Sequence, residues 1–106
     1  MYTIINNKKY EVIEMNTFIK RLKGLMLKKD PIDKIYFFPK CSSIHTYFMK
    51  QNIDVCILDK NYKVLYKQSN LKPRKILIKK GKHTLEMPLN TTKNIKINDI
   101  IKISAN

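Results

Sequence analysis

The chain has 106 residues, of which 43% are hydrophobic, with only 2 glycines and 4 prolines. This composition suits one globular domain over residues 1–106 and excludes a disordered or low-complexity chain. No apolar run approaches the roughly 20 residues of a membrane span, and Cys41 and Cys56 are too few for a disulfide framework. The N-terminus lacks the features of a signal peptide, so we expect a cytoplasmic protein with reduced thiols and no disulfide.

The formal net charge is +14, from 22 lysines and arginines against 8 acidic residues. This excess favours an anionic partner, such as nucleic acid, a membrane surface or an acidic protein. Codon supply in an AT-rich genome would produce the same composition, because lysine, isoleucine and asparagine are abundant together. Only Arg21 and Arg74 are arginines, the residue better suited to bidentate phosphate and base contacts. Nucleic-acid binding is therefore an alternative that the sequence does not favour.

The first part of the chain predicts a hairpin and then a helix. Tyr2–Ile5 and Tyr10–Ile13 are short β-rich runs on either side of Asn6-Asn7, and asparagine tolerates left-handed turns. Asn16 can cap a helix through its side-chain oxygen. Apolar residues follow it at helical spacing: Phe18, Leu22, Leu25 and Met26. Pro31 marks the end of this segment.

The remainder of the chain predicts short strands. They are expected at residues 35–38, 44–49, 53–58, 62–67, 76–78, 84–87 and 100–103. Pro88 begins a short helix that runs to about Asn94. The pattern predicts a compact α+β fold, mainly antiparallel β. It would be a partial barrel of short strands with one main helix near the N-terminus and one short helix near the C-terminus.

Four motifs occur in a familiar order. Arg21–Met26 resembles the Arg-x-x-Gly-Leu-Met box of domain-of-unknown-function family 192, a widespread bacterial and archaeal family. Ser43–Lys50 resembles its aromatic-Met-Lys segment, Ile53–Val55 its apolar-Asp-apolar strand, and Thr84–Pro88 its Val-Leu-Glu-Leu-Pro box. The resemblance covers nearly the whole chain after Met15. It implies a small β-rich α+β domain and no established activity.

The stretch Cys41–Asp59 is the longest apolar region, yet it carries both cysteines, a histidine and Asp54. A carboxylate between Ile53 and Val55 needs partners, because burying an unpaired charge costs roughly several kcal/mol. Asp54 is then either a structural residue bonded to backbone amides or to a cation such as Arg21, or a general acid/base or ligand anchor.

Cys41, His45 and Met49 share one face if this stretch is extended. Thiolate, imidazole and thioether suit a soft metal such as Cu(I) or Zn. The spacing matches no known metal signature, so we expect neither a metal nor a cofactor. Cys41 and His45 could also form a nucleophile and base, with Asp54 as the orienting acid. That arrangement depends on the register of the turn at Lys50–Asn52, which the sequence leaves open.

Glu86 ends a predicted strand, where it either bonds amides of the following helix or joins Asp54 in a polar cleft. His83 is expected to be exposed. Together these residues predict a non-catalytic binding module for a small ligand or a partner segment. The candidate ligand-binding residues are Arg21, His45, Tyr47, Met49, Lys50, Asp54 and Glu86. The alternatives are an enzyme that uses His45 with Asp54 or Glu86, and an electrostatic binder of nucleic acid or anionic surfaces.

Overall fold

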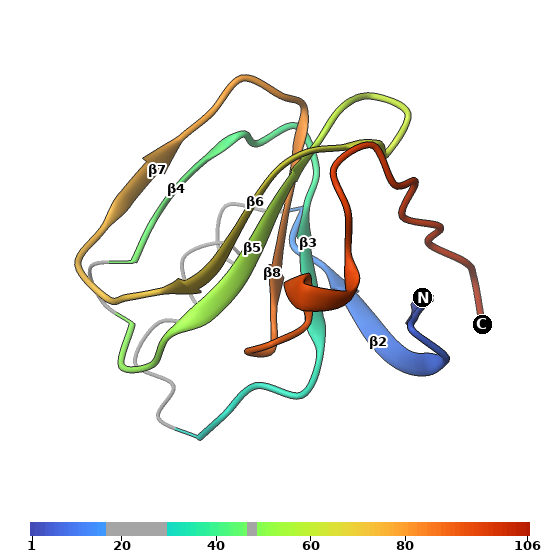
Figure 1. The fold of residues 1–106 in the computed structure, drawn as a ribbon, viewed down its shortest axis with the longest axis horizontal. Helices are drawn as coiled ribbons and strands as arrows, with labels where there is room; N and C mark the ends of the chain where they lie inside the picture. Colours follow the sequence, from blue (N-terminus) through green and yellow to red (C-terminus); the bar gives the residue numbers. More distant parts are fainter. Residues whose placement is uncertain (17–29, 47–48) are drawn as a thin grey trace.

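The computed structural model describes residues 1–16, 30–46 and 49–106, apart from the side chain of His45. These residues form eight strands and one 3₁₀ helix. The elements are β1 (Tyr2–Ile5), β2 (Lys8–Glu14), β3 (Ile35–Phe38), β4 (Ser43–His45), β5 (Ile53–Leu58), β6 (Val64–Leu71), β7 (Ile76–Ile78), β8 (His83–Met87) and η1 (Thr92–Asn94). Figure 1 shows β4 and β7 on one side of the molecule and both chain ends on the other.

Six strands form one sheet in the order β1-β2-β3-β8-β5-β6, and β4 and β7 form a separate two-stranded ribbon. All neighbours are antiparallel except β2 and β3, which run parallel with Val12 opposite Ile35. The central strands β5 and β8 are buried along their whole length. Their continuous apolar runs fit this position, because a strand covered on both faces need not alternate polar with apolar residues.

The sheet separates two hydrophobic cores. One face carries Phe37, Cys56 and Leu85, and residues from the C-terminal segment, Ile95 and Ile101, cover them. We call this the first core. The opposite face, the second core, is built from the following residues: Met15, Ile32, Tyr36, Phe38, Ile44, Met49, Ile53, Val55, Ile57, Leu71 and Leu77. The β4–β7 ribbon covers this second face through Ile44 and Leu77.

The C-terminal segment reaches both ends of the strand order. Tyr2 and Ser104 exchange two backbone hydrogen bonds of 2.9 and 2.8 Å, which attach the segment to β1. The N–H of Val64, at the start of β6, donates to the carbonyl of Asp99 at 2.8 Å. The expected strand at 100–103 is therefore reduced to isolated bridges, at Ile100 and Ser104. The sheet itself stays open, because β1 and β6 do not pair with each other.

The prediction of an α+β fold is wrong. The described residues are nearly all β and contain no helix of seven or more residues. The short helix expected after Pro88 shrinks to η1, because Asn90 has a left-handed φ of 72° and Ile95 is already extended. The expected helix after Asn16 lies over residues 17–29, outside the described residues.

The arrangement considered for Cys41, His45 and Asp54 required the strands on either side of Lys50–Asn52 to pair, and they do not. β4 pairs with β7, with His45 opposite Ile76, and does not form a hairpin with β5. β5 lies between β6 and β8 instead. The register left open at Lys50–Asn52 therefore concerns two strands that are not partners. This central position suits β5, because its apolar run is buried along its whole length and contributes side chains to both cores.

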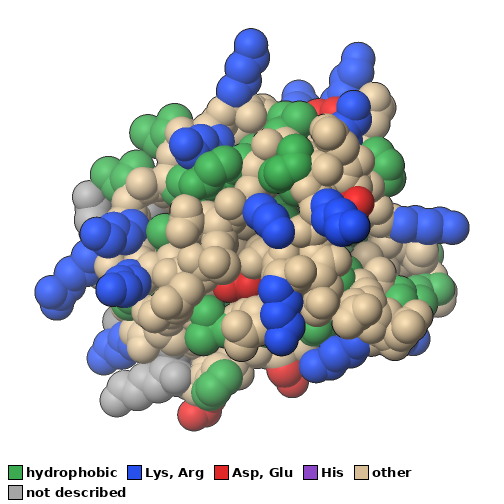
Figure 2. All heavy atoms as spheres, in the orientation of Figure 1, with side chains coloured by type: hydrophobic (Ala, Val, Ile, Leu, Met, Phe, Trp, Pro, Cys, Tyr) green, Lys and Arg blue, Asp and Glu red, His purple; other side chains and the backbone are tan. Residues whose placement is uncertain are grey.

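Positive charge covers the surface without much pairing. Among the residues that the structure describes, the ion pairs join Lys34 to Glu11 at 3.8 Å and to Asp33 at 3.6 Å. Figure 2 shows lysines and arginines dispersed over one face, between hydrophobic side chains. Within the described ranges, no helix has the length and hydrophobicity needed to cross a membrane.

Candidate functional site

Asp54 is fully buried on the first-core side of the sheet and accepts three hydrogen bonds. Its Oδ1 accepts from the backbone N–H of Asn70 at 2.9 Å. Its Oδ2 accepts from the N–H and the hydroxyl of Thr92, at 2.9 and 2.7 Å. The carboxylate thus ties β6 and η1 to β5 through two main-chain amides and one hydroxyl. Bonding to backbone amides was one of the roles considered for it, and Arg21 lies outside the described residues.

Lys67 completes this attachment from the other end of η1. Its Nζ donates to the carbonyls of Thr92 at 3.1 Å and Ile95 at 2.6 Å. An acid at the N–H end of a helical turn and a cation at its carbonyl end both oppose the helix dipole.

Cys56 lies opposite Lys67 in the register. Burial raises the pKa of the Cys56 thiol to about 12, with the charge of Asp54 adding to the shift. This thiol is therefore protonated at neutral pH and unsuited to nucleophilic attack.

Glu86 lies on the opposite face of the sheet from Asp54. In the β5–β8 register Asp54 stands opposite Met87, whereas Glu86 stands opposite Val55, and adjacent residues of a strand point to opposite faces. Glu86 therefore faces the second core with Tyr36 and Val55. The two carboxyls expected in one cleft are separated by the sheet.

The carboxyl of Glu86 is buried, with 6% of the residue exposed. No described residue donates a hydrogen bond to it or forms an ion pair with it. Burial alone raises the pKa of Glu86 to about 8. At neutral pH the side chain is therefore mostly a neutral acid, able to donate one hydrogen bond and to accept others.

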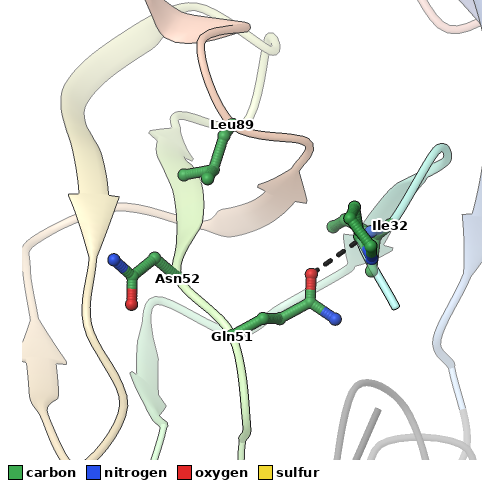
Figure 3. Close-up of a pocket in the computed structure, with 5 residues that line it drawn as sticks. Ile32, Gln51, Asn52 and Leu89 are labelled. Atoms are coloured by element: carbon green, nitrogen blue, oxygen red, sulfur yellow. Dashed lines mark hydrogen bonds between the residues drawn. The ribbon is translucent and has the colours of Figure 1, made fainter. Parts of the chain in front are cut away.

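An open hollow of about 220 Å³ lies where β5 begins and β8 has ended (Figure 3). Its walls are mainly apolar, with side-chain amides among them. The lining residues are Pro31, Ile32, Gln51, Asn52 and Leu89. Ile32 belongs to the second core, the side that Glu86 faces.

Side-chain amides hold the walls of this hollow in place. Gln51 Oε1 accepts from the N–H of Ile32 at 3.2 Å, the bond drawn in Figure 3, and its Nε2 donates to the carbonyl of Asp30 at 2.7 Å. Asn52 Nδ2 donates to Asn70 Oδ1 at 2.8 Å. The hollow was not foreseen from the sequence, because its residues come from three distant segments.

Among the other predicted site residues, Met49 and Lys50 are described in full. Arg21 and Tyr47 lie outside the described residues, and His45 is placed only through its backbone in β4. Met49 is buried in the second core, and Lys50 is exposed.

Of the weak metal candidates Cys41, His45 and Met49, the structure describes the side chains of Cys41 and Met49. Cys41 Sγ donates to the carbonyl of Ser43 at 3.1 Å. Met49 packs in the second core. Within the described ranges no three His, Cys, Asp or Glu residues are grouped as metal ligands would be.

His83 was expected to be exposed, and this prediction is wrong: only 8% of the residue is accessible. Its ring packs against those of Phe37 and Tyr62, with centroids 5.3 and 5.2 Å away. Its Nδ1 accepts from the N–H of Lys40 at 3.1 Å. Burial lowers its pKa, and the charge of Lys82 lowers it further. Alternation along the strand could not have revealed this, because β8 is buried on both faces, including at its polar residues Thr84 and Glu86.

Comparison with known proteins shows which family this chain resembles. The model of the DUF192 family, described as "Uncharacterized ACR", matches residues 2–103. The UPF0127 protein PH1112 of Pyrococcus horikoshii is 37% identical over 92 residues, covering 81% of this chain and 79% of its own length.

Two crystal structures share the fold at 15% sequence identity. A Novosphingobium aromaticivorans protein of unknown function has a TM-score of 0.77 over 96% of this chain and 82% of its own. A Sinorhizobium meliloti protein, described as a "putative transcription regulator", has a TM-score of 0.80 over 95% of this chain and 89% of its own. With the family model spanning nearly all of the sequence, the chain belongs to domain-of-unknown-function family 192.

Proposed function

We propose that this domain is a non-catalytic binding module whose ligand occupies the hollow at the start of β5 and pairs with Glu86. One observation carries the proposal: a carboxyl with 6% exposure and no described partner faces the second core, and Ile32 of that core lines the hollow. Glu86 itself is not among the lining residues, so the ligand would have to reach it from the hollow. Buried polar groups normally have partners, so a group that lacks one marks either strain or a place for a ligand.

The chemistry of the hollow and of the Glu86 carboxyl suggests the class of ligand. The hollow offers apolar contacts from Ile32 and Leu89. Glu86 offers a carboxyl whose raised pKa would fall when a cation arrives. A small molecule or partner segment with an apolar portion and a primary ammonium group would satisfy both.

Asp54 does not belong to this site. Its oxygens already accept hydrogen bonds from Asn70 and Thr92 on the other face of the sheet. A mechanism that needed Asp54 and Glu86 at one substrate would have to act through the sheet. Glu86 would therefore act alone as the anchor for the ligand.

The test uses 3-methylbutylamine as the probe and 3-methylbutanol, with the same carbon skeleton, as its control. Binding of the ammonium ion requires ionised Glu86, so affinity should rise between pH 6 and pH 8, with proton release detected by calorimetry in buffers of different ionisation enthalpy. The side-chain amide signals of Gln51 and Asn52 should shift in NMR spectra.

The parent protein should bind the amine about tenfold more tightly than the alcohol, which is the scale of one buried charge-assisted hydrogen bond. The Glu86→Gln variant should lose this preference. Glu11→Gln, at a glutamate with a 54% exposed side chain, is the matched control and should bind as the parent does. Equal affinity for amine and alcohol, or shifts confined to residues far from the hollow, would refute the proposal.

A further inference from the structure

The β4–β7 ribbon presents an apolar outer face. Leu77 and its partner Ile44 point into the second core. Ile76 and Ile78, the neighbours of Leu77 in β7, point away from it and are 57% and 72% exposed. Ile78 is the most exposed of the large hydrophobic residues described in the chain. Two isoleucines thus project side by side from one strand, on the side of the molecule opposite the chain ends (Figure 1).

Cations flank these isoleucines on both sides along the chain. The segment 72–82 contains six exposed basic residues and no acidic residue: Lys72, Arg74, Lys75, Lys79, Lys80 and Lys82. An anionic surface would be attracted to this segment before any apolar contact formed, and the attraction would weaken with salt. We call Ile76, Ile78 and these six cations the ribbon patch.

The structure holds the ribbon patch in one shape. Thr46, only 1% exposed, donates from its hydroxyl to the carbonyl of Lys72 at 2.7 Å and accepts from the N–H of Lys75 at 2.9 Å. The N–H of Lys82 donates to the carbonyl of Leu58 at 2.7 Å at the other end. Lys79 Nζ lies 4.4 Å from the centre of the Tyr66 ring. Binding would therefore require little ordering of this segment.

We propose that the ribbon patch docks the protein on an anionic lipid bilayer. Two signals together, a cluster of cations and a few inserted apolar side chains, give membrane-surface binding that neither gives alone. The ribbon supplies both within eleven consecutive residues. The patch is separate from the hollow, so this docking does not depend on the binding function proposed above.

Other anionic partners fit the patch less well. Strand addition by an acidic peptide depends on a row of main-chain bonds, and β7 is three residues long. Single-stranded nucleic acid is bound by stacking bases on aromatic rings, whereas isoleucines stand between the cations here. A bilayer places phosphates around the cations and acyl chains beneath the isoleucines.

Sedimentation with vesicles tests the docking. Vesicles of phosphatidylcholine with phosphatidylglycerol should bind the protein, and vesicles of phosphatidylcholine alone should not. Ile76→Ser with Ile78→Ser should weaken binding about tenfold or more, because both side chains leave the acyl region. Ile4→Ser is the matched control, since Ile4 is 61% exposed in β1, and it should leave binding unchanged.

The charges are tested in the same assay. Lys75→Gln with Lys80→Gln should weaken binding more than tenfold, since each cation at an anionic surface contributes about a fivefold factor. Lys60→Gln with Lys93→Gln removes the same charge from exposed positions outside the patch and should have a much smaller effect.

Fluorescence locates the contact. The chain contains no tryptophan, so the Ile78→Trp variant carries a single probe. Its emission should shift to the blue with anionic vesicles and be quenched by lipids brominated on the acyl chains, whereas Ile4→Trp should show neither effect. Vesicle binding that survives the paired Ile→Ser change, equal loss in both lysine pairs, or tighter binding to duplex DNA than to vesicles at the same salt would overturn the proposal.

Discussion

At the scale of single residues, the two carboxyls of the central strands behave in opposite ways. Asp54 accepts from Asn70 and from Thr92, whereas Glu86 has no partner in the described part of the chain. The sequence predicted that a carboxylate between Ile53 and Val55 would need partners. It could not name Thr92, because that residue is 38 positions away and depends on the β8–η1 connection. A buried charge can be recognised from its neighbours in the sequence, but its partners depend on long-range packing.

Replacing Asp54 by asparagine should destabilise the fold by about 2–4 kcal/mol, because the amide would direct N–H groups at the donors of Thr92. Urea unfolding followed by circular dichroism measures the change. Asp33→Asn, at an aspartate whose side chain is 86% exposed, should alter the free energy of unfolding by less than about 0.5 kcal/mol. An Asp54→Asn protein as stable as the parent would refute the structural role.

Glu86 predicts a pH dependence of stability. Its pKa is about 8 in the folded protein against 4.5 for the free side chain, so the folded state binds more protons than the unfolded state between these values. The contribution of Glu86 to stability is therefore largest at low pH and falls as pH rises from about 4.5 to 8. The fall is at most about 1.4 kcal/mol per pH unit.

The Glu86→Gln variant should remove this fall, because glutamine stays neutral, and should be more stable than the parent at pH 8 by on the order of 1–3 kcal/mol. Chemical unfolding of both proteins at a series of pH values gives the difference. Glu11→Gln serves as the exposed control. Parallel pH profiles for the parent and Glu86→Gln would show that Glu86 ionises normally.

At the scale of elements, apolar runs identified strands but not their partners. The strands at 35–38, 53–58 and 76–78 were predicted with the bounds that the structure has. The ribbon of β4 with β7 and the parallel pair of β2 with β3 were not, because each joins segments distant in the sequence. The predicted grouping of the site residues failed for this reason, since the face on which a side chain lies follows from the register of its strand.

Gly81 anchors the connection between β7 and β8, and its replacement by alanine should cost about 1–3 kcal/mol. A Cβ atom there would overlap the Cγ2 methyl of Ile57 and lie 3.2 Å from the carbonyl oxygen of Leu58. Ile57 is fully buried and cannot move aside. Thermal and urea unfolding should show the loss, while Lys80→Ala, at an exposed neighbour in the same connection, should not. Equal stability of the two variants would contradict this close packing.

At the scale of the whole molecule, charge repulsion opposes folding. The net charge of +14 is placed on 106 residues, and ion pairing among the described residues is confined to Lys34 with Glu11 and Asp33. Like charges gathered in the compact state repel one another, and dissolved ions screen that repulsion. The net charge that causes this repulsion can be read from the composition of the sequence alone.

The melting temperature should therefore rise when sodium chloride is increased from about 0.01 M to about 0.15 M, where the screening length falls from roughly 30 Å to 8 Å. Differential scanning calorimetry measures it. Lys50→Gln with Lys102→Gln, both at exposed positions, should raise the melting temperature at low salt and reduce its response to salt. A melting temperature that fell with added salt would show that attractive pairs dominate.

The bridge between Tyr2 and Ser104 has a practical consequence. Because these positions exchange two hydrogen bonds, donor and acceptor dyes attached near them would lie within a small fraction of their Förster radius. Energy transfer between the dyes would be close to complete in the native protein and would drop sharply when the chain expands. Such a doubly labelled chain would report folding one molecule at a time.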